Sequence, residues 1–465
     1  MEAAALEGLL PELDRHLARF RDCFSRKEQR ASLRVLVRGQ LSGLERKSLE
    51  PIALEFGLPP RNLQQFMSQA GWDHDRVRAK THEIIREQFD EADSVGIIDE
   101  TYHAKKGDRT PGVQRQWCGT KGTTDNCTVT VHLALAAGES RCLVDSDLFL
   151  PEESWSNHRD RCRKAGIPDE VVYRPKWRIA LELFDRSRGN GVRYGWLTFD
   201  AGYGMHSDFL TGLDQRGALY VGEVPGHLPG WTKPPPVMLK EHASRDRTGH
   251  PRAFPRVKVL PGGMHKAKSV ESLTRRSPAF RSQGWTPFHV KDDSCGPVVW
   301  KAKEASFHLR TGGRDVGTPT RAHRLIIAQS VLETRVVKDR THKPNAKNKK
   351  RRRQRAVKRE LVTKYFVSNA PMSVPLARLL KVAFTRWVVE RSFQDAKGEL
   401  GLSHFEVRTY TSLIRHLILT AVSFLFLSRA LRRRGGEKGG ANDLSTPAGD
   451  GAADHPGLGP REALV

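Results

Sequence analysis

This sequence contains no zinc-finger cysteine pair and few long apolar runs. The six cysteines form no CxxC pair and have no neighbouring histidine at zinc-finger spacing, which argues against a structural zinc site or a disulfide framework. The N-terminal segment is acidic and interrupted by charge, unlike a secretory signal. The most apolar run, Leu417 to Leu427, is too short to span a bilayer and predicts a buried helix. We therefore expect a cytoplasmic protein with no membrane partner.

Acidic residues are scarce relative to basic ones. The chain has 53 Asp and Glu against 78 Lys and Arg, a formal net charge of +25. Such a surplus favours a polyanionic partner, with nucleic acid as the first choice, although a merely basic protein has the same composition. With 465 residues, 38% of them hydrophobic, the chain is long enough to form two or three domains.

Hydrophobic periodicity predicts an α/β core between helical segments. SVGIID, VQRQWCGTKG and NCTVTVHLALA read as three strands of a meander, and RYGWLTFD and ALYVGEV read as later strands that alternate with helices. The following Pro-rich segment and its short β-like pieces predict an inserted β-rich domain. The expected divisions are residues 1–90 (helical, DNA-binding), 91–226 (first part of the core), 227–370 (insertion), 371–434 (last part of the core) and 435–465 (a disordered, Gly-rich tail).

Residues 47–72 contain two short helical pieces joined at Gly57. Ala53, Gly57 and Leu63 have the spacing of a helix-turn-helix: a small residue where the helices cross, a glycine at the turn and an apolar residue in the second helix. An ordinary helical hairpin fits the pattern equally well. If the two pieces form a helix-turn-helix, the start of its recognition helix carries Arg61, Asn62, Gln64 and Gln65.

A strongly basic run lies inside the predicted insertion. Residues 338–359 hold twelve Lys or Arg and one Asp. Charge runs are usually solvated, but this density favours an exposed loop that contacts phosphates. Its most basic stretch is Lys349, Lys350, Arg351, Arg352 and Arg353.

Three acids stand out by position. Asp99 and Asp200 each follow an apolar predicted strand, and Glu390 lies on a predicted helix free of proline between Leu376 and Leu402. Carboxylates at strand ends are costly unless they meet water or a cation. Two strand ends with a helix across them can gather three carboxylates around divalent ions, which suits phosphodiester cleavage and strand transfer.

Two cations share the predicted helical face of Glu390. Arg386 lies roughly 40° from Glu390 and Lys397 about 20° away, as expected for phosphate-binding groups beside a metal ligand. Asp395 and Glu399 point about 140° and 180° away, so we expect them to pair with solvent or with basic residues of the helix. Glu100 adjoins Asp99 but points to the other side of the strand.

These motifs together resemble a known family. IIDET, TFDAGYG and RWVVERSFQDAKGELGLSHFEVRTY resemble the DDE transposases of bacterial insertion sequences, in the group whose third motif is a Tyr, Arg, Glu, Lys series. Arg386, Glu390 and Lys397 match that series at its spacing, and QWCGTKGTTDNCTVTVHLALA resembles the segment after the first Asp. The resemblance covers residues 90 to 430.

The resemblance implies an RNase H-like (retroviral integrase-like) fold with a mixed sheet. It also implies two Mg²⁺ ions, with Mn²⁺ as a substitute, held by Asp99, Asp200 and Glu390. The expected partners are double-stranded DNA, as terminal inverted repeats and target, and a second copy in a synaptic dimer. Two alternatives stay open: a domesticated, transposase-derived DNA-binding protein and an RNase H-like endonuclease that cuts without joining.

The sequence departs from the family at one motif position. Ala383 stands where the family has Tyr, so the phosphate contact of that Tyr is absent. Phe384 and Trp387 lie nearby, and their rings are of the kind that stacks on a displaced base.

Overall fold

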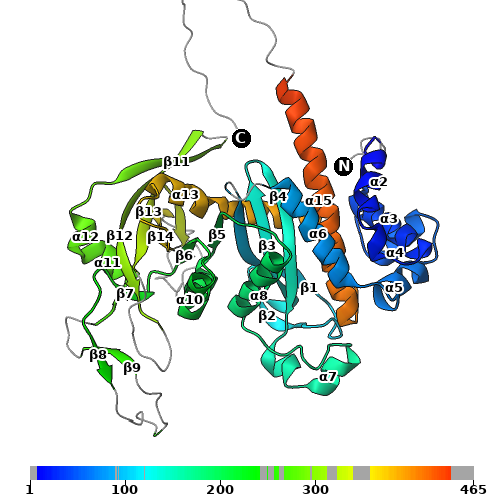
Figure 1. Cartoon of the computed structure of the whole chain (residues 1–465), viewed down its shortest axis with the longest axis horizontal. Coiled ribbons are helices and arrows are strands. Elements are labelled where there is room, and N and C mark those ends of the chain that lie inside the picture. Colours follow the sequence, from blue (N-terminus) through cyan, green and yellow to red (C-terminus); the bar gives the residue numbers. More distant parts are fainter. Residues whose placement is uncertain are drawn as a thin grey trace, which may run out of the picture.

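The computed structural model places N-terminal helices at one end, a mixed sheet in the middle and a second sheet at the other end (Figure 1). It describes residues 8–89, 92, 94–119, 121–240, 249, 256–260, 266–293, 296–311, 322–338 and 357–440. The N-terminal elements are α2 (Leu10–Ala18), η1 (Arg21–Cys23), α3 (Lys27–Leu41), α4 (Leu49–Glu55), α5 (Pro60–Ser68) and α6 (His74–Gln88).

Helices α4 and α5 form the predicted pair. Ala53 and Leu63 are fully buried, and Gly57 turns the chain with a φ of 66°, which only glycine adopts without strain. The contacts fit either a helix-turn-helix or a plain helical hairpin. The start of α5 is exposed, because the apolar residues of this helix face the neighbouring helices.

The central sheet has the order β2-β3-β1-β5, with β4 also paired to β3. Its strands are β1 (Val95–Ala104), β2 (Gln114–Cys118), β3 (Thr123–Ala137), β4 (Ser140–Phe149) and β5 (Trp196–Phe199). The first three are not a meander in chain order, because β3 pairs with both β1 and β2 and lies between them. Strand β5 runs parallel to β1, and all other pairs in this sheet are antiparallel.

Strand β4 is not among the strands predicted from the sequence. Its sequence, SRCLVDSDLF, contains two aspartates, which made it look unlike a buried strand. Both are nevertheless buried, and arginines of the following segment pair with them: Arg186 with Asp145 and Arg174 with Asp147. These pairs meet the requirement that buried charges be compensated.

The segment between β4 and the insertion is mostly helical. They are η2 (Glu152–Ser156), α7 (Arg159–Lys164), α8 (Lys176–Gly189), α9 (Ala201–Gly204) and α10 (Ser207–Gln215), and the last strand before the insertion is β6 (Val221–Val224). The order α8, β5, α10, β6 agrees with the sequence prediction, whereas η2, α7 and α9 were not predicted.

The predicted insertion forms a second sheet, in the order β10-β7-β12-β13-β14-β6, with β11 paired to β12. Strand β6 belongs to this sheet and also approaches β5 through a bridge between Leu197 and Tyr220. The elements are β7 (Pro229–Trp231), β8 (Val237–Lys240), β9 (Arg256–Val259), β10 (Lys268–Ser269), α11 (Val270–Arg276), α12 (Pro278–Arg281), β11 (Thr286–Asp293), β12 (Gly296–Leu309), β13 (His323–Lys338) and β14 (Val357–Ser368).

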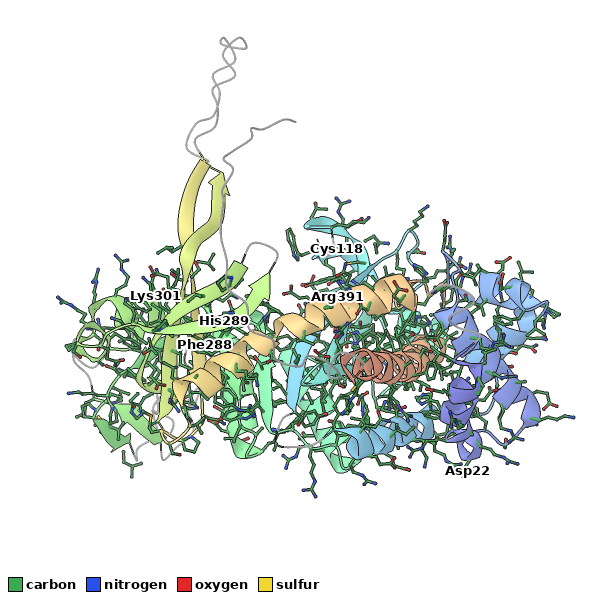
Figure 2. The ribbon with its side chains drawn as sticks, turned by 90° about the horizontal axis from the view of Figure 1, so that it is seen from above. Asp22, Cys118, Phe288, His289, Lys301 and Arg391 are labelled. Carbon is green, nitrogen blue, oxygen red and sulfur yellow. The ribbon has the colours of Figure 1, made fainter. Side chains whose placement is uncertain are left out.

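The ends of the basic run lie in paired strands rather than in a loop. Lys338 closes β13 opposite Val357 at the start of β14, and Val337 pairs with Lys358. Figure 2 shows this hairpin rising away from the rest of the molecule. The run between the two strands, with all five residues predicted from Lys349 to Arg353, lies outside the described residues.

The predicted catalytic helix is two consecutive helices, α13 (Leu376–Thr385) and α14 (Trp387–Glu399). They meet at Arg386, whose amide donates to the carbonyl of Ala383, a tightened i to i−3 bond. Figure 2 shows the two helices as one long rod that crosses the molecule, with Arg391 on its second half.

The last described element is α15 (Tyr410–Gly440), which is longer than predicted. Tyr410–Arg432 is long and apolar enough to cross a membrane, although the apolar run Leu417 to Leu427 alone was predicted to be too short. However, 89% of its most apolar window is buried inside the protein. It packs against β4, α3, α5 and α6 and is therefore a core helix. Residues 435–440 of the predicted disordered tail are helical, and 441–465 lie outside the described residues.

Candidate active site

Asp99 and Asp200 lie side by side because of the register between two parallel strands. Ile98 on β1 pairs with Phe199 on β5, and an aspartate follows each of these two residues in the chain. The prediction that Asp99 ends its strand is wrong, because β1 continues to Ala104 beyond the apolar stretch. Asp200 does follow the last residue of β5.

Backbone amides orient the carboxylate of Asp200. It caps the short helix α9, accepting from the amides of Gly202 at 2.9 Å and Tyr203 at 3.3 Å. The DAGYG sequence permits this tight turn, since a Cβ on Gly204 would lie 2.0 Å from the carbonyl oxygen of Glu223. Strand β6 therefore approaches the site closely.

Arg386 connects the strand acids to the helix acid. Its Nη1 lies 3.4 Å from Asp99 Oδ2, and its Nη2 lies 3.0 Å from Glu390 Oε1. The side chains of Asp99 and Arg386 are 15% and 14% exposed, whereas that of Glu390 is 62% exposed. In this conformation Arg386 is thus a counter-ion shared by two carboxylates, and its predicted contact with DNA stays a prediction.

The pKa values of both aspartates are raised above their ordinary value. Burial, then the charge of Asp200, raises the pKa of Asp99 to about 7, although Arg386 opposes the shift. Burial and the charge of Glu100 raise the pKa of Asp200. Burial lowers the pKa of Arg386, but the surrounding carboxylates raise it overall. The site therefore holds more negative charge than one guanidinium compensates, which favours binding of a further cation.

Glu100 follows Asp99 on β1 and has hydrogen-bond partners of its own. Its carboxylate accepts from Lys176 at 2.7 Å and from the Tyr102 hydroxyl at 3.0 Å. Its charge nevertheless reaches Asp200, so Glu100 contributes to the electrostatics of the site.

Glu223 on β6 is a further acid near the site that was not predicted from the sequence. This carboxylate contributes to the raised pKa of Arg386 and forms an ion pair with Lys364 at 2.6 Å. The signal was available, because Glu223 follows an apolar stretch in ALYVGEV as the other acids do in their strands.

Asp395 and Glu399, the two helix acids predicted to point away from Glu390, have partners of their own. Asp395 pairs with Arg391 on the same helix, as predicted, and also with Arg141 on β4. Glu399 ends α14 and its carbonyl oxygen accepts from Lys47.

Lys397 lies two turns beyond Glu390 and reaches β1. Its Nζ donates to the carbonyl oxygen of Tyr102 at 3.2 Å, and burial lowers its pKa. This bond fixes α14 over the strand that carries Asp99.

Ala383, which stands at the position of the family's Tyr, is buried. Ala383 is 4% exposed, and Phe384 is 7% exposed within a cluster of rings from Phe288, Trp300, Phe366 and Trp387. The suggestion that Phe384 stacks on a base is therefore wrong, since its ring is part of the core. Trp387 is only partly buried and borders the same cluster.

The predicted recognition residues do not belong to this site. The side chains of Arg61, Asn62, Gln64 and Gln65 are exposed on α5, among the N-terminal helices. They form a separate surface.

Within the described ranges, no three His, Cys, Asp or Glu side chains are placed closely enough to hold a metal ion together. Asp99 and Asp200 nevertheless suit a hard divalent cation, because they present adjacent carboxylate oxygens with uncompensated charge. Glu390 is separated from them by the guanidinium of Arg386.

Sequence comparison defines the class of protein. Residues 19–291, more than half of the chain, match the family described as DDE superfamily endonuclease, so the chain belongs to this family. The matched region contains Asp99 and Asp200 but ends before Glu390. Members of this superfamily generally use divalent metal ions.

One related protein has a more specific description than the family. The chain is 30% identical over 186 residues to a protein of Microchaete diplosiphon named "Probable transposase for insertion sequence element IS701". The match covers 39% of this chain and 46% of the relative, so it spans about half the length of that protein.

Proposed function

We propose that this protein is the DNA transposase of an insertion sequence. It binds the terminal inverted repeats of its element, cleaves phosphodiester bonds and joins the freed 3′-hydroxyls to target DNA. The observation that carries the proposal is the parallel register that sets Asp99 beside Asp200, with Arg386 linking Asp99 to Glu390 on the long helix. Family membership and the named relative support the same function.

In this proposal Asp99, Asp200 and Glu390 hold two Mg²⁺ ions, for which Mn²⁺ can substitute. Bound there, the ions would supply activation of the attacking water or 3′-hydroxyl and stabilisation of the leaving oxygen. Asp200 is preoriented by two backbone amides, and Glu390 joins the aspartates when Arg386 releases its carboxylate. Arg386 is then available for a DNA phosphate, as the sequence predicted.

The sheet order supports an RNase H-like core. Strands β4, β3, β1 and β5 lie in that order, with a parallel bridge from β5 to Tyr220 ahead of β6. In this assignment residues 91–226 and 371–434 form the catalytic core, 227–370 form the insertion and 1–90 form the DNA-binding region. The exposed start of α5 and the basic segment 349–353 are the proposed DNA contacts outside the core, and synapsis of two ends requires a dimer. The protein would act in the cytoplasm, at the nucleoid.

The test is a cleavage and joining assay. Purified protein is incubated with Mg²⁺, a labelled duplex from each end of the genomic segment that carries the gene, and a supercoiled target plasmid. We expect cuts at the repeat ends and joined products in Mg²⁺, and neither in EDTA. Cuts without joined products would favour the endonuclease alternative, and binding without cuts would favour a domesticated DNA-binding protein.

Replacing Lys397 by Ala is expected to weaken binding of a duplex that ends in the precleaved 3′-hydroxyl. A hydrogen bond to a charged group contributes about 1.5 to 3 kcal/mol, so affinity should fall at least tenfold. Fluorescence anisotropy measures the effect. Lys381→Ala, on the exposed face of α13, is the matched control. Equal affinities of the two variants, or failure of Lys397→Arg to restore binding, would refute this role.

A further inference from the structure

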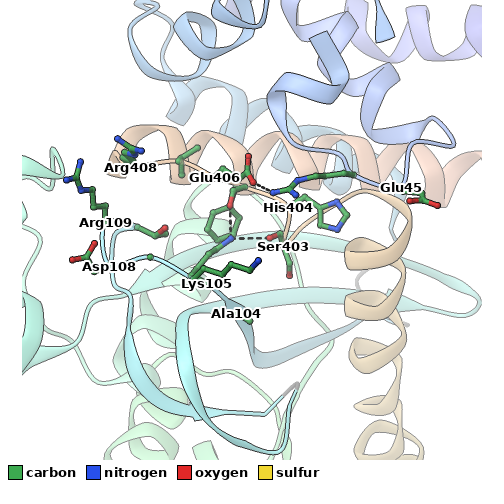
Figure 3. Close-up of a pocket in the computed structure, with 15 residues that line it drawn as sticks. Glu45, Ala104, Lys105, Asp108, Arg109, Ser403, His404, Glu406 and Arg408 are labelled. Atoms are coloured by element: carbon green, nitrogen blue, oxygen red, sulfur yellow. Dashed lines mark hydrogen bonds and ion pairs between the residues drawn. The ribbon is translucent and has the colours of Figure 1, made fainter. Parts of the chain in front are cut away.

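A basic pocket opens beyond the carboxyl end of β1. Its volume is about 1100 Å³, and three segments that are distant in sequence line it. They are residues 45–46 between α3 and α4, residues 104–110 after β1, and residues 403–408 between α14 and α15. Figure 3 shows Arg109 and Arg408 at one end of the pocket and Glu45 at the other. We call it the β1-end pocket.

Cations outnumber acids in the β1-end pocket. Its lining contains five Lys or Arg and three Asp or Glu. One acid is already neutralised, because Glu406 forms an ion pair with Arg46. The side chains of Lys106, Arg109 and Arg408 are exposed and face a volume above the range of about 300 to 1,000 Å³ that is typical of small-molecule sites.

Lys105 lies partly buried at the base of the pocket. Its Nζ donates to the carbonyl oxygens of Ser403 at 3.1 Å and Phe405 at 2.6 Å, and lies over the Phe405 ring (Figure 3). No carboxylate pairs with it among the residues that the structure describes. Burial and the charge of Arg46 lower the pKa of Lys105 to about 7. An anion in the pocket would relieve this electrostatic penalty.

The pocket continues the line of the candidate active site. Strand β1 carries Asp99, then Tyr102 beneath Lys397, then Ala104 at the pocket. Five residues of strand from Asp99 to Ala104 span about 17 Å, the rise of about five base pairs of DNA. Lys397 and then the pocket therefore follow the aspartates in the direction of β1.

We propose that the β1-end pocket binds the sugar-phosphate backbone of the substrate DNA about five base pairs from the scissile phosphate. This inference rests on the proposed function. Lys106, Arg109 and Arg408 contact the phosphates, and Lys105 lies behind them at the base of the pocket.

The test compares two triple variants that each remove three positive charges. The pocket variant is Lys106→Gln, Arg109→Gln and Arg408→Gln. The control is Arg275→Gln, Arg276→Gln and Arg281→Gln, exposed residues on α11 and α12 at the far end of the molecule (Figure 1). Binding of a mixed-sequence duplex is measured in EDTA over a range of salt concentrations. We expect only the pocket variant to bind on the order of tenfold weaker, with a log-log salt slope shallower by about 2.7, or 0.9 per phosphate contact.

A second measurement locates the contact on the DNA. Single methylphosphonates, which remove one phosphate charge, are placed along a cleavable duplex. We expect the wild type to bind more weakly when the substitution lies about five base pairs from the cleavage point, and the pocket variant to be insensitive there. Equal binding by the pocket and control variants, or equal sensitivity of wild type and pocket variant at that phosphate, would overturn the proposal. Because the first measurement needs no cleavage, an inactive wild type would refute the proposed function and not the pocket.

Discussion

Replacing Asp99 by Asn, Asp200 by Asn or Glu390 by Gln should abolish Mg²⁺-dependent cleavage while DNA binding stays close to wild type. Each change removes a proposed metal ligand but keeps the shape of the side chain and the basic surface. The loss of several kcal/mol of metal stabilisation in the transition state corresponds to a rate decrease of roughly a thousandfold or more. Single-turnover cleavage of a labelled repeat-end duplex measures it.

The controls are acids close in sequence to the predicted ligands but away from the site. The control variants are Asp208→Asn and Glu399→Gln. Asp208 lies exposed on the first turn of α10, and Glu399 is the last residue of α14, the helix that carries Glu390. Both variants should cleave at nearly the wild-type rate. Retained cleavage in one of the three ligand variants, at unchanged thermal stability, would remove that residue from the catalytic set.

Replacing Asp145 by Ala should destabilise the fold by about 3 to 5 kcal/mol, the cost of leaving buried charges without their partner. Asp145 lies on β4 with its side chain 1% exposed. It accepts from Arg186 of α8 at 2.6 Å, and Arg78 of α6 lies 3.2 Å away. It therefore links the N-terminal helices, the central sheet and α8. Urea unfolding followed by circular dichroism measures the loss.

The effect of Asp145 should depend on pH. Burial raises the pKa of Asp145, but Arg186 and Arg78 together lower it by more than burial raises it. The pKa of Asp145 in the folded protein therefore lies below the ordinary value. The stabilisation is therefore present above about pH 4 and is lost as the pH falls. The control is Asp185→Ala, which breaks a surface pair with Arg216 and should cost no more than about 1 kcal/mol. Equal losses in the two variants, or a loss for Asp145→Asn that persists unchanged at low pH, would contradict this role.

Local sequence patterns predicted most core elements because each depends on residues close in the chain. SVGIID, NCTVTVHLALA and GWLTFD form strands, and LPELDRHLARF and VRAKTHEIIREQF form helices. Patterns failed where a distant partner decides the outcome. Strand β4 is buried despite its two aspartates because arginines on α6 and α8 neutralise Asp145. The ring of Phe384 is part of the core because its partners lie up to 96 positions earlier, at Phe288.

The sequence by itself determined the basic character of the protein, the order of its elements and the three acids, since composition and hydrophobic periodicity are properties of the chain. The tertiary structure decided which groups meet. Only strand register sets Asp99 beside Asp200, and only the packing of α13 and α14 directs Arg386 toward Asp99 and Glu390. The β1-end pocket is likewise built from segments more than 350 residues apart, between Arg46 and Arg408. Such proximity depends on long-range packing, which no local pattern encodes.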